Sequence, residues 1–328
     1  SPRQTDRHPL GPGFFQNEPR HHHHHHHHHQ HREATRMKLV SYNIQYGKGK
    51  DGRFDLGRIA AVLQDADVIA LQEVERHWPR SGDQDQPAEL ARLLGGAYHG
   101  VYGPGFDVDA NGSTPGSRRR QFGNMVLSRW PILSSRHHLL PKLGLTRQFS
   151  LQRSVIEAVI APPGAAPLRV HSLHLSHVGD GDRAAQVERL LQLHREAPLE
   201  GGAWCGTHAE TDWTLGLPPP PMPAEAVYLG DFNLAPDSPL YTRLVGPWSP
   251  DYGRMSHHGG LVDAWVAAGG AEHDPAAWTC DSCEPPQRHR RIDHCLLSTE
   301  MAHRVRRCWI DHAATGSDHQ PLWVELEG

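Results

Sequence analysis

The sequence predicts an α/β fold built from layers of strands and helices. Short apolar segments of strand length recur along the chain, and between them lie segments whose apolar residues repeat with helical spacing. No stretch of about 18 apolar residues is present, which excludes a transmembrane helix. Strands interspersed with helices favour a layered α/β domain over a helix bundle or a pure β-sandwich.

Five predicted elements make up the first part of the chain. Residues 38–44 (KLVSYNI) alternate apolar and polar side chains, as a half-buried strand does, and residues 67–74 (DVIALQEV) form an apolar strand that ends in a carboxylate. Apolar residues on one helical face predict a helix over 54–63. A second helix is predicted over 87–94, because proline occupies a first helical position, and a strand follows over 123–127.

The second part continues the same pattern. Apolar residues predict strands over 155–160 and 168–175, and an amphipathic helix is predicted over 182–195. Residues 226–233 (AVYLGDFN) predict a buried strand that ends in polar side chains. Three further strands are predicted near the end of the chain, over 292–297, 305–310 and 320–326.

Two stretches rich in glycine and proline, residues 103–116 and 198–225, are predicted to be long surface loops and not linkers between domains. The second loop carries Trp204 and Trp213, which either cover the functional site or pack the loop onto the protein. We therefore expect residues 37–328 to form one domain.

Residues 1–36 differ in composition from the rest of the chain. They hold 11 of the 28 histidines and are expected to be a disordered His-rich tag or N-terminal extension, with a native metal-binding tract as the alternative. Five arginines against three acidic residues in this segment turn the net charge of −4 into −6 for residues 37–328. That acidic balance argues against a strong nucleic-acid binder without sequence preference.

Five cysteines at scattered spacings do not form a disulfide framework, which favours a reducing compartment. The sequence shows no apolar signal segment with a cleavage site, so a cytoplasmic location is expected. Cys280 and Cys283 would make half of a zinc site, but the spacing to His289 or Cys295, which would have to complete it, fits no common zinc finger. The alternative is two ordinary thiols in a loop.

Polar side chains lie at the ends of the predicted apolar strands, except Asp293, which lies inside one. Because strand ends in layered α/β folds converge on ligands, we expect these side chains to lie close together. Carboxylate and amide oxygens are ligands that Mg²⁺ prefers, whereas zinc prefers histidine and cysteine. The residues concerned are Asn43, Glu73, His174, Asp231, Asn233, Asp293, Asp318 and His319.

Seven short motifs, in this order, resemble the endonuclease/exonuclease/phosphatase superfamily, which is DNase I-like. The resemblance implies a four-layer α/β sandwich, with two central mixed sheets flanked by helices, and a metal-dependent phosphoric ester hydrolase. The motifs are SYNIQYG (41–47), LQEV (71–74), GNMVLSRWPI (123–132), HSLHLSH (171–177), GDFN (230–233), RIDH (291–294) and SDHQPL (317–322).

The resemblance implies a site for Mg²⁺, with Mn²⁺ as the alternative. Glu73 and Asp318 match its metal ligands, and Asn43 offers its carbonyl to the metal or its NH₂ to the phosphate. His319 matches the general base, and Asp293 matches the carboxylate that orients it. Because neighbours on a strand point to opposite faces, Asp318 is not expected to pair with His319.

The remaining site residues surround the reacting phosphate. By resemblance, Asp231 orients the nucleophile or protonates the leaving group, Asn233 supports the phosphate, and His174 donates to the phosphoryl oxygens. Arg153 and Asn124 are candidate phosphate-binding residues, and a surface ion pair is the alternative for Arg153. Two flanking histidines are expected to be bystanders, namely His171 and His177.

The substrate is expected to be a phosphate ester, with no obligate protein partner. A nuclease is the first hypothesis, with Arg118 to Arg120 on backbone phosphates. The alternative is a phosphoesterase acting on a lipid headgroup, as sphingomyelinases and inositol phosphatases do, or on a small phosphate ester. A non-catalytic metal-binding or scaffold protein is the third hypothesis, and the complete set of polar residues speaks against it.

Overall fold

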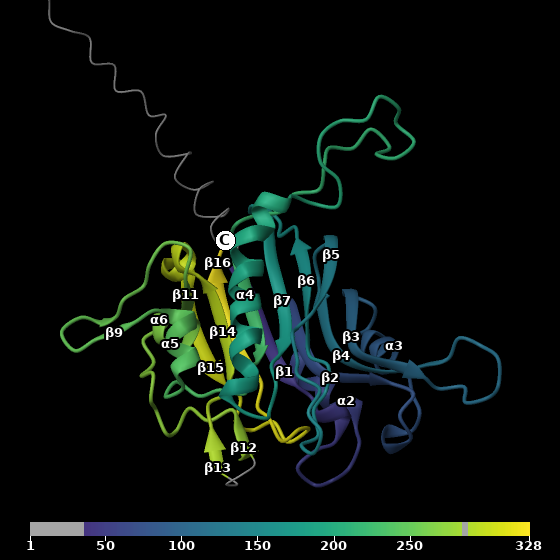
Figure 1. Ribbon diagram of the computed structural model, residues 1–328, viewed down its shortest axis with the longest axis horizontal. Helices are drawn as coiled ribbons and strands as arrows, with labels where there is room; N and C mark the ends of the chain where they lie inside the picture. Colours follow the sequence, from purple (N-terminus) through teal and green to yellow (C-terminus); the bar gives the residue numbers. More distant parts are fainter. Residues whose placement is uncertain (1–35, 284–287) are drawn as a thin grey trace, which may run out of the picture.

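Two six-stranded mixed sheets lie face to face in the computed structural model, which describes residues 36–283 and 288–328 (Figure 1). The first sheet has the order β15 (Val305–Ile310), β16 (Leu322–Glu327), β1 (Arg36–Asn43), β2 (Val68–Arg76), β4 (Arg119–Ser128) and β3 (His99–Asp109). The second has the order β11 (Leu261–Asp263), β14 (Asp293–Ser298), β8 (Ala226–Asp231), β7 (Leu168–His174), β6 (Ser154–Ile160) and β5 (Ile132–Leu139). The predicted N-terminal extension, residues 1–36, lies outside the described part except for Arg36.

Helices cover the outer face of each sheet, and two small hairpins project from the body. The helices are α2 (Leu56–Leu63), α3 (Gln86–Leu93), α4 (Asp180–Glu200), α5 (Pro239–Val245) and α6 (Ala264–Ala267), with 3-10 segments η1 (Gln45–Gly47), η2 (Pro79–Ser81) and η3 (Thr299–Arg304). The hairpins pair β9 (Trp248–Ser249) with β10 (Gly253–Arg254), and β12 (Cys280–Cys283) with β13 (Arg288–Arg290).

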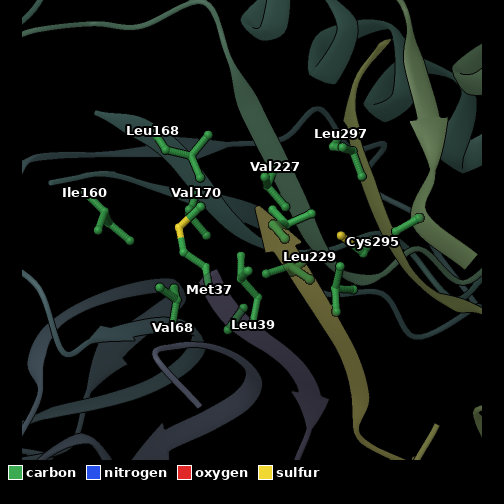
Figure 2. Close-up of a cluster of buried hydrophobic side chains, with 14 of the residues drawn as sticks. Met37, Leu39, Val68, Ile160, Leu168, Val170, Val227, Leu229, Cys295 and Leu297 are labelled. Carbon is green, nitrogen blue, oxygen red and sulfur yellow. The ribbon is translucent and has the colours of Figure 1, made fainter. Parts of the chain in front are cut away.

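Three hydrophobic cores separate four layers. The central core lies between the two sheets, where Met37 and Leu39 of the first sheet meet Val170 and Leu229 of the second (Figure 2). A second core joins the first sheet to α2 and α3, and a third joins the second sheet to α4 and α5. The layers are therefore helix, sheet, sheet and helix, which is the four-layer α/β sandwich that the sequence predicts.

Strand β1 is buried on both faces, although its alternating sequence predicts a half-buried strand. Leu39 contributes to the central core, whereas Val40 and Tyr42 pack on the other face among the residues of α2. A central strand of a covered sheet has no solvent-facing side, so its polar residues need internal partners. Ser41 accordingly lies within 3.4 Å of the Gln72 amide, which donates to it.

Strands β3 and β5 are missing from the sequence prediction. Residues 103–109, predicted as part of a loop, belong to β3, where Pro104 is tolerated because β3 lies at the edge of its sheet. Glycine is required at the β3–β4 contact, since a Cβ on Gly123 would lie 2.1 Å from the Gly103 oxygen. In β5, residues with intermediate exposure alternate with exposed ones, so its apolar signal is weak.

Helix α4 begins two residues before the predicted helix 182–195 and ends five residues after it, with Pro198 in the last turn. In the part of the chain that the structure describes, no helix is both long and apolar enough to cross a membrane.

Candidate active site

Polar side chains converge where the ends of four central strands meet. β1 and β2 run parallel in the first sheet, and β7 and β8 run parallel in the second, so the carboxyl ends of each pair share one edge. Asn43 at the end of β1 joins the two sheets. Its Nδ2 donates to Glu73 Oε2 at 2.6 Å and to Asp231 Oδ2 at 3.1 Å. As placed, its NH₂ faces the carboxylates, while its Oδ1 accepts from the Gln45 backbone at 3.0 Å.

Glu73 departs from the regular geometry of β2. The β2–β4 pairing shifts register between Leu71 and Val74, and Glu73 itself has a φ of 55°. An irregularity of this kind re-aims a side chain at the end of a strand, and a positive φ on glutamate needs support from its surroundings. Burial and the nearby carboxylate of Asp318 raise the pKa of Glu73 to about 7.

His319 and Asp293 form a buried pair. His319 Nδ1 lies 2.7 Å from Asp293 Oδ2, so this nitrogen donates to the carboxylate. The other ring nitrogen, Nε2, lies 3.6 Å from Asp231 Oδ2. Burial disfavours the imidazolium, but the carboxylates of Asp293 and Asp231 outweigh it and hold the pKa of His319 well above its usual range. Burial also raises the pKa of Asp293 to about 6.

Asp231 is the centre of the cluster. Besides Asn43, its Oδ2 faces His174 Nε2 at 3.1 Å, and its Oδ1 accepts from the Asn233 backbone N–H at 2.9 Å. Burial alone would raise the pKa of Asp231, yet His174 and His319 hold it below its usual range. Asp231 is therefore an ionised acceptor shared by both sheets.

Arg153 lies in the site and not in a surface ion pair. Its Nη1 donates to His174 Nδ1 at 3.0 Å, and its Nη2 donates to His177 Nδ1 at 3.2 Å. Because Nδ1 of His174 accepts, Nε2 carries the proton of the neutral ring and donates to Asp231. Burial and the Arg153 guanidinium lower the pKa of His174 to about 4. His177, expected to be a bystander, thus contacts a site residue, whereas His171 does not.

A narrow recess lies beside Arg153 and Glu73. Asn124 lines it and donates through Nδ2 to the Ser154 carbonyl at 2.9 Å. Two buried polar atoms at this recess have no protein partner, Asn124 Oδ1 and Arg153 Nε. Buried polar atoms are normally hydrogen-bonded, so these two mark a place for a water molecule or a single polar ligand atom.

Asn233 and Asp318 lie at the margin of the cluster. Asn233 has a φ of 51° and its Nδ2 donates to the Leu175 carbonyl at 2.8 Å, so this amide ties together the segments that follow β7 and β8. Asp318 accepts from the Ser317 hydroxyl at 3.3 Å and does not pair with His319. The same hydroxyl donates to the Asn43 carbonyl at 2.6 Å and so fixes the SDH segment against β1.

The donor set of the cluster fits a cation. Among the described residues, two groups place three potential ligand atoms within 4.8 Å of one another, namely Glu73 with His174 and Asp231, and Asp231 with Asp293 and His319. Four carboxylates gather here, namely Glu73, Asp231, Asp293 and Asp318, and the charge of Asp318 adds to burial in raising the pKa of Glu73. A hard cation would relieve that excess of negative charge.

Thr279 and Cys280 are site neighbours that the sequence analysis did not single out for this cluster. Thr279 Oγ1 accepts from the Asp293 backbone N–H at 3.0 Å, and Cys280 pairs with His319 in an isolated bridge, with its thiol contributing to the raised pKa of His319. Cys280 and Cys283 belong to strand β12 and not to a loop. No metal-ligand group in the described part contains a cysteine, and the side chain of Cys283 lies outside that part. Thr279 and Cys280 lie outside all seven motifs, so no sequence signal indicated their place beside the cluster.

The loop with Trp204 and Trp213 does not cover the cluster. It connects α4 to the beginning of β8, whereas the cluster lies at the end of β8. Figure 1 shows this loop at the upper right, at the pole opposite to β12 and β13. Trp213 remains 78% exposed, so it does not pack the loop down either.

Two of the three arginines expected to contact nucleic acid are paired with carboxylates of the chain. Arg118 pairs with Asp83, and Arg119 Nε donates to Asp107 Oδ1 at 2.9 Å. Arg120 Nε donates to the His77 carbonyl at 3.0 Å. The basic run is therefore largely neutralised within the structure.

The fold and the cluster define a layered α/β protein whose carboxylates and imidazoles meet at the ends of two central sheets. The chain belongs to the Endonuclease/Exonuclease/phosphatase family, whose family model matches residues 40–319.

Solved structures of similar fold bear out the architecture. An endonuclease/exonuclease/phosphatase from Beutenbergia cavernae DSM 12333 is 24% identical, with 89% of this chain and 72% of that chain covered and a TM-score of 0.61. A humanized TDP2 from D. rerio is 17% identical over 90% of this chain and 100% of that chain, with a TM-score of 0.55. ANGEL2, a 2′,3′-cyclic phosphatase, is 16% identical over 88% and 94% of the two chains, with a TM-score of 0.56. At these identities the likeness establishes the fold alone.

Proposed function

We propose that this protein is a phosphoesterase that hydrolyses a phosphodiester or phosphomonoester with the help of a divalent cation, Mg²⁺ or Mn²⁺. The observation that carries the proposal is the buried series Asp293, His319 and Asp231 next to Glu73. An imidazole held by a carboxylate can take a proton from water, and crowded carboxylates suit a hard cation. Family membership supports phosphate-ester hydrolysis as the reaction.

His319 and its two carboxylate neighbours activate the attacking water in this proposal. Asp293 accepts from Nδ1, which leaves Nε2 to take the proton. Asp231 lies 3.6 Å from the same nitrogen and orients the water between them. Because its pKa is held low, Asp231 acts as an acceptor, and protonation of the leaving group is the weaker of its two expected roles.

Arg153 and His174 stabilise charge on the phosphoryl oxygens, whereas Asn124 has a positioning role because its Nδ2 is committed to the Ser154 carbonyl. Arg153 Nε is buried without a partner, and His174 carries an N–H at Nε2, next to Asp231 Oδ2. Fixed donors in a site shielded from water stabilise a developing negative charge strongly. The Asn233 side chain is committed to the Leu175 carbonyl, so we assign it a positioning role and not contact with the phosphate.

Glu73 and Asp231 would hold the cation, with Asp318 close enough to raise the pKa of Glu73, and Asn43 would position both ligands through its NH₂ group. A bound divalent cation would polarise the phosphoryl oxygens and offset the carboxylates that raise the pKa of His319.

Replacing Glu73 with glutamine is expected to raise the Mg²⁺ concentration for half-maximal activity by at least about tenfold, since one anionic ligand is lost. The measurement is hydrolysis of bis(p-nitrophenyl) phosphate during a Mg²⁺ titration after EDTA treatment. Glu89→Gln, on the exposed side of α3, is the matched control and should leave the titration unchanged. An unchanged titration for Glu73→Gln would remove this residue from the metal site.

Nicking of a supercoiled plasmid in Mg²⁺ tests the nuclease form of the proposal. A nuclease is expected to nick the plasmid, to stop in EDTA and to lose activity in His319→Ala. Hydrolysis of bis(p-nitrophenyl) phosphate without nicking would instead favour a lipid-headgroup or small phosphate ester. Arg118 and Arg119, which pair with carboxylates of the chain, weaken the nuclease form, and the exposed Leu143 and Phe149 between β5 and β6 favour the lipid form.

A further inference from the structure

One loop at the edge of the candidate site exposes apolar side chains in succession. It connects β5 to β6, and residues 141–149 are all exposed. We call residues 139–149 the apolar loop. Leu140 is buried at its base, and the exposed large apolar side chains are Leu139 at 56%, Leu143 at 67%, Leu145 at 37% and Phe149 at 69%.

The base of the apolar loop is fastened to the candidate site. The Leu140 N–H donates to the Arg153 carbonyl at 2.9 Å, and Gln152 Nε2 donates to the Leu140 carbonyl at 2.7 Å, which closes the loop. Gln186 joins the loop to the end of β7, because its Nε2 donates to the Pro141 carbonyl at 3.1 Å and its Oε1 accepts from the Ser176 N–H at 2.8 Å. The loop therefore starts and ends beside the recess, while its tip faces solvent.

The charge of the apolar loop has one sign. Lys142 and Arg147 lie among the exposed apolar residues, and the sequence from 139 to 153 contains no aspartate or glutamate. Basic residues interleaved with exposed leucine and phenylalanine are typical of segments that insert into an anionic lipid surface. A protein surface that binds nucleic acid usually offers several aromatic side chains on which bases stack. Phe149 is the only aromatic residue of the apolar loop.

The other strongly apolar loop has the opposite charge and lies at the other pole. Trp213 and Leu215 are both 78% exposed, but residues 199–217 contain three acidic residues and neither lysine nor arginine. An anionic surface would repel this segment. Of the two apolar surfaces, only the loop beside the site is complementary to an anionic membrane.

We propose that the apolar loop, residues 139–149, docks the mouth of the candidate site onto an anionic lipid bilayer. Leu143, Leu145 and Phe149 enter the interface, and Lys142 and Arg147 contact the anionic headgroups. A site held at the membrane in this way meets phosphate esters that the bilayer carries. The docking itself does not depend on the proposed hydrolysis.

Co-flotation of the full chain with phosphatidylcholine vesicles that contain about 30% phosphatidylserine tests the proposal. The wild type is expected to float with the vesicles and to detach as salt is raised, because salt screens the basic residues. Leu143→Ser/Phe149→Ser should lower the vesicle-bound fraction by at least about tenfold, since insertion depends on buried apolar area. Both positions are exposed, so the far-ultraviolet circular dichroism should remain that of the wild type.

Trp213→Ser/Leu215→Ser is the matched control, because it removes equally exposed apolar side chains from the opposite pole. It should float as the wild type does. The proposal is overturned if the wild type stays unbound, or if Leu143→Ser/Phe149→Ser floats unchanged. Binding of duplex DNA that Lys142→Ser/Arg147→Ser abolishes, without flotation, would assign the loop to nucleic acid and also overturn it.

Hydrolysis of soluble bis(p-nitrophenyl) phosphate separates this proposal from the proposed function. The wild type and both apolar double variants should hydrolyse it equally, because their substitutions leave the buried cluster intact. A wild type that floats without hydrolysing the ester would contradict the function alone. One that hydrolyses the ester without floating would contradict the docking alone.

Discussion

Replacing His319 with alanine is expected to lower kcat for bis(p-nitrophenyl) phosphate by about 10²- to 10⁴-fold, the usual contribution of a general base. The reason is geometric, because Asp293 accepts from His319 Nδ1, and this leaves Nε2, which faces Asp231, to take the proton. A loss of this size corresponds to roughly 3–5 kcal/mol of transition-state stabilisation. Steady-state kinetics at saturating Mg²⁺ measure it.

His303→Ala provides the control, because this histidine is exposed on η3 and is not part of the cluster. Its kcat should equal that of the wild type. Circular dichroism of His319→Ala should match the wild type, so that lost turnover is not confused with lost folding. A kcat within about twofold of the wild type would remove His319 from the reaction.

Replacing Arg169 with methionine is expected to lower the free energy of unfolding by about 3–5 kcal/mol, as breaking a buried ion pair does. Arg169 is fully buried at the beginning of β7. Its Nη1 donates to Glu157 Oε2 at 3.4 Å, its Nε to the Pro223 carbonyl at 2.6 Å, and its Nη2 to the His194 carbonyl at 3.2 Å. Methionine fills similar space but leaves the carboxylate and the carbonyls without this donor. Urea unfolding monitored by fluorescence measures the difference.

Arg243→Met is the matched control for this effect. Arg243 donates to Glu188 Oε1 at 2.7 Å, but both side chains are about half exposed, so its loss should cost about 0–1 kcal/mol. Below its unfolding transition, Arg169→Met should keep its kcat, because Arg169 lies at the opposite end of β7 from His174. Equal unfolding midpoints for the two variants would contradict the structural role of Arg169.

Much of the fold is predictable because buried strands carry continuous or alternating apolar residues. Strand β15 has the predicted bounds 305–310, and β6 begins one residue before the predicted strand 155–160. Strand β3 is not predictable in this way, since Gly103, Pro104 and Gly105 are unfavourable in strands and are tolerated there by the edge position and a close backbone contact with β4. Pairing with a neighbour, and not local preference, makes this segment a strand.

The candidate site is predictable to a similar extent. Polar residues at strand ends stand out against apolar segments, so Glu73, Asp231 and His319 are visible in the sequence. Their hydrogen-bond partners are not, because Asn43 and Asp231 lie 188 residues apart and come from different sheets. The contact between Arg153 and His177 likewise depends on where β6 begins and β7 ends, and spacing along the chain does not indicate it.

By itself, the sequence determined the layered α/β class, the family resemblance and the residue types available for chemistry. These follow from local patterns of apolar and polar side chains, which physical chemistry constrains residue by residue. Only the tertiary structure decided that Arg118 and Arg119 are neutralised by carboxylates, and that the apolar loop lies beside the site while the tryptophan loop lies at the far pole. Those outcomes depend on which strand ends share an edge, and that is a property of sheet topology and not of any single segment.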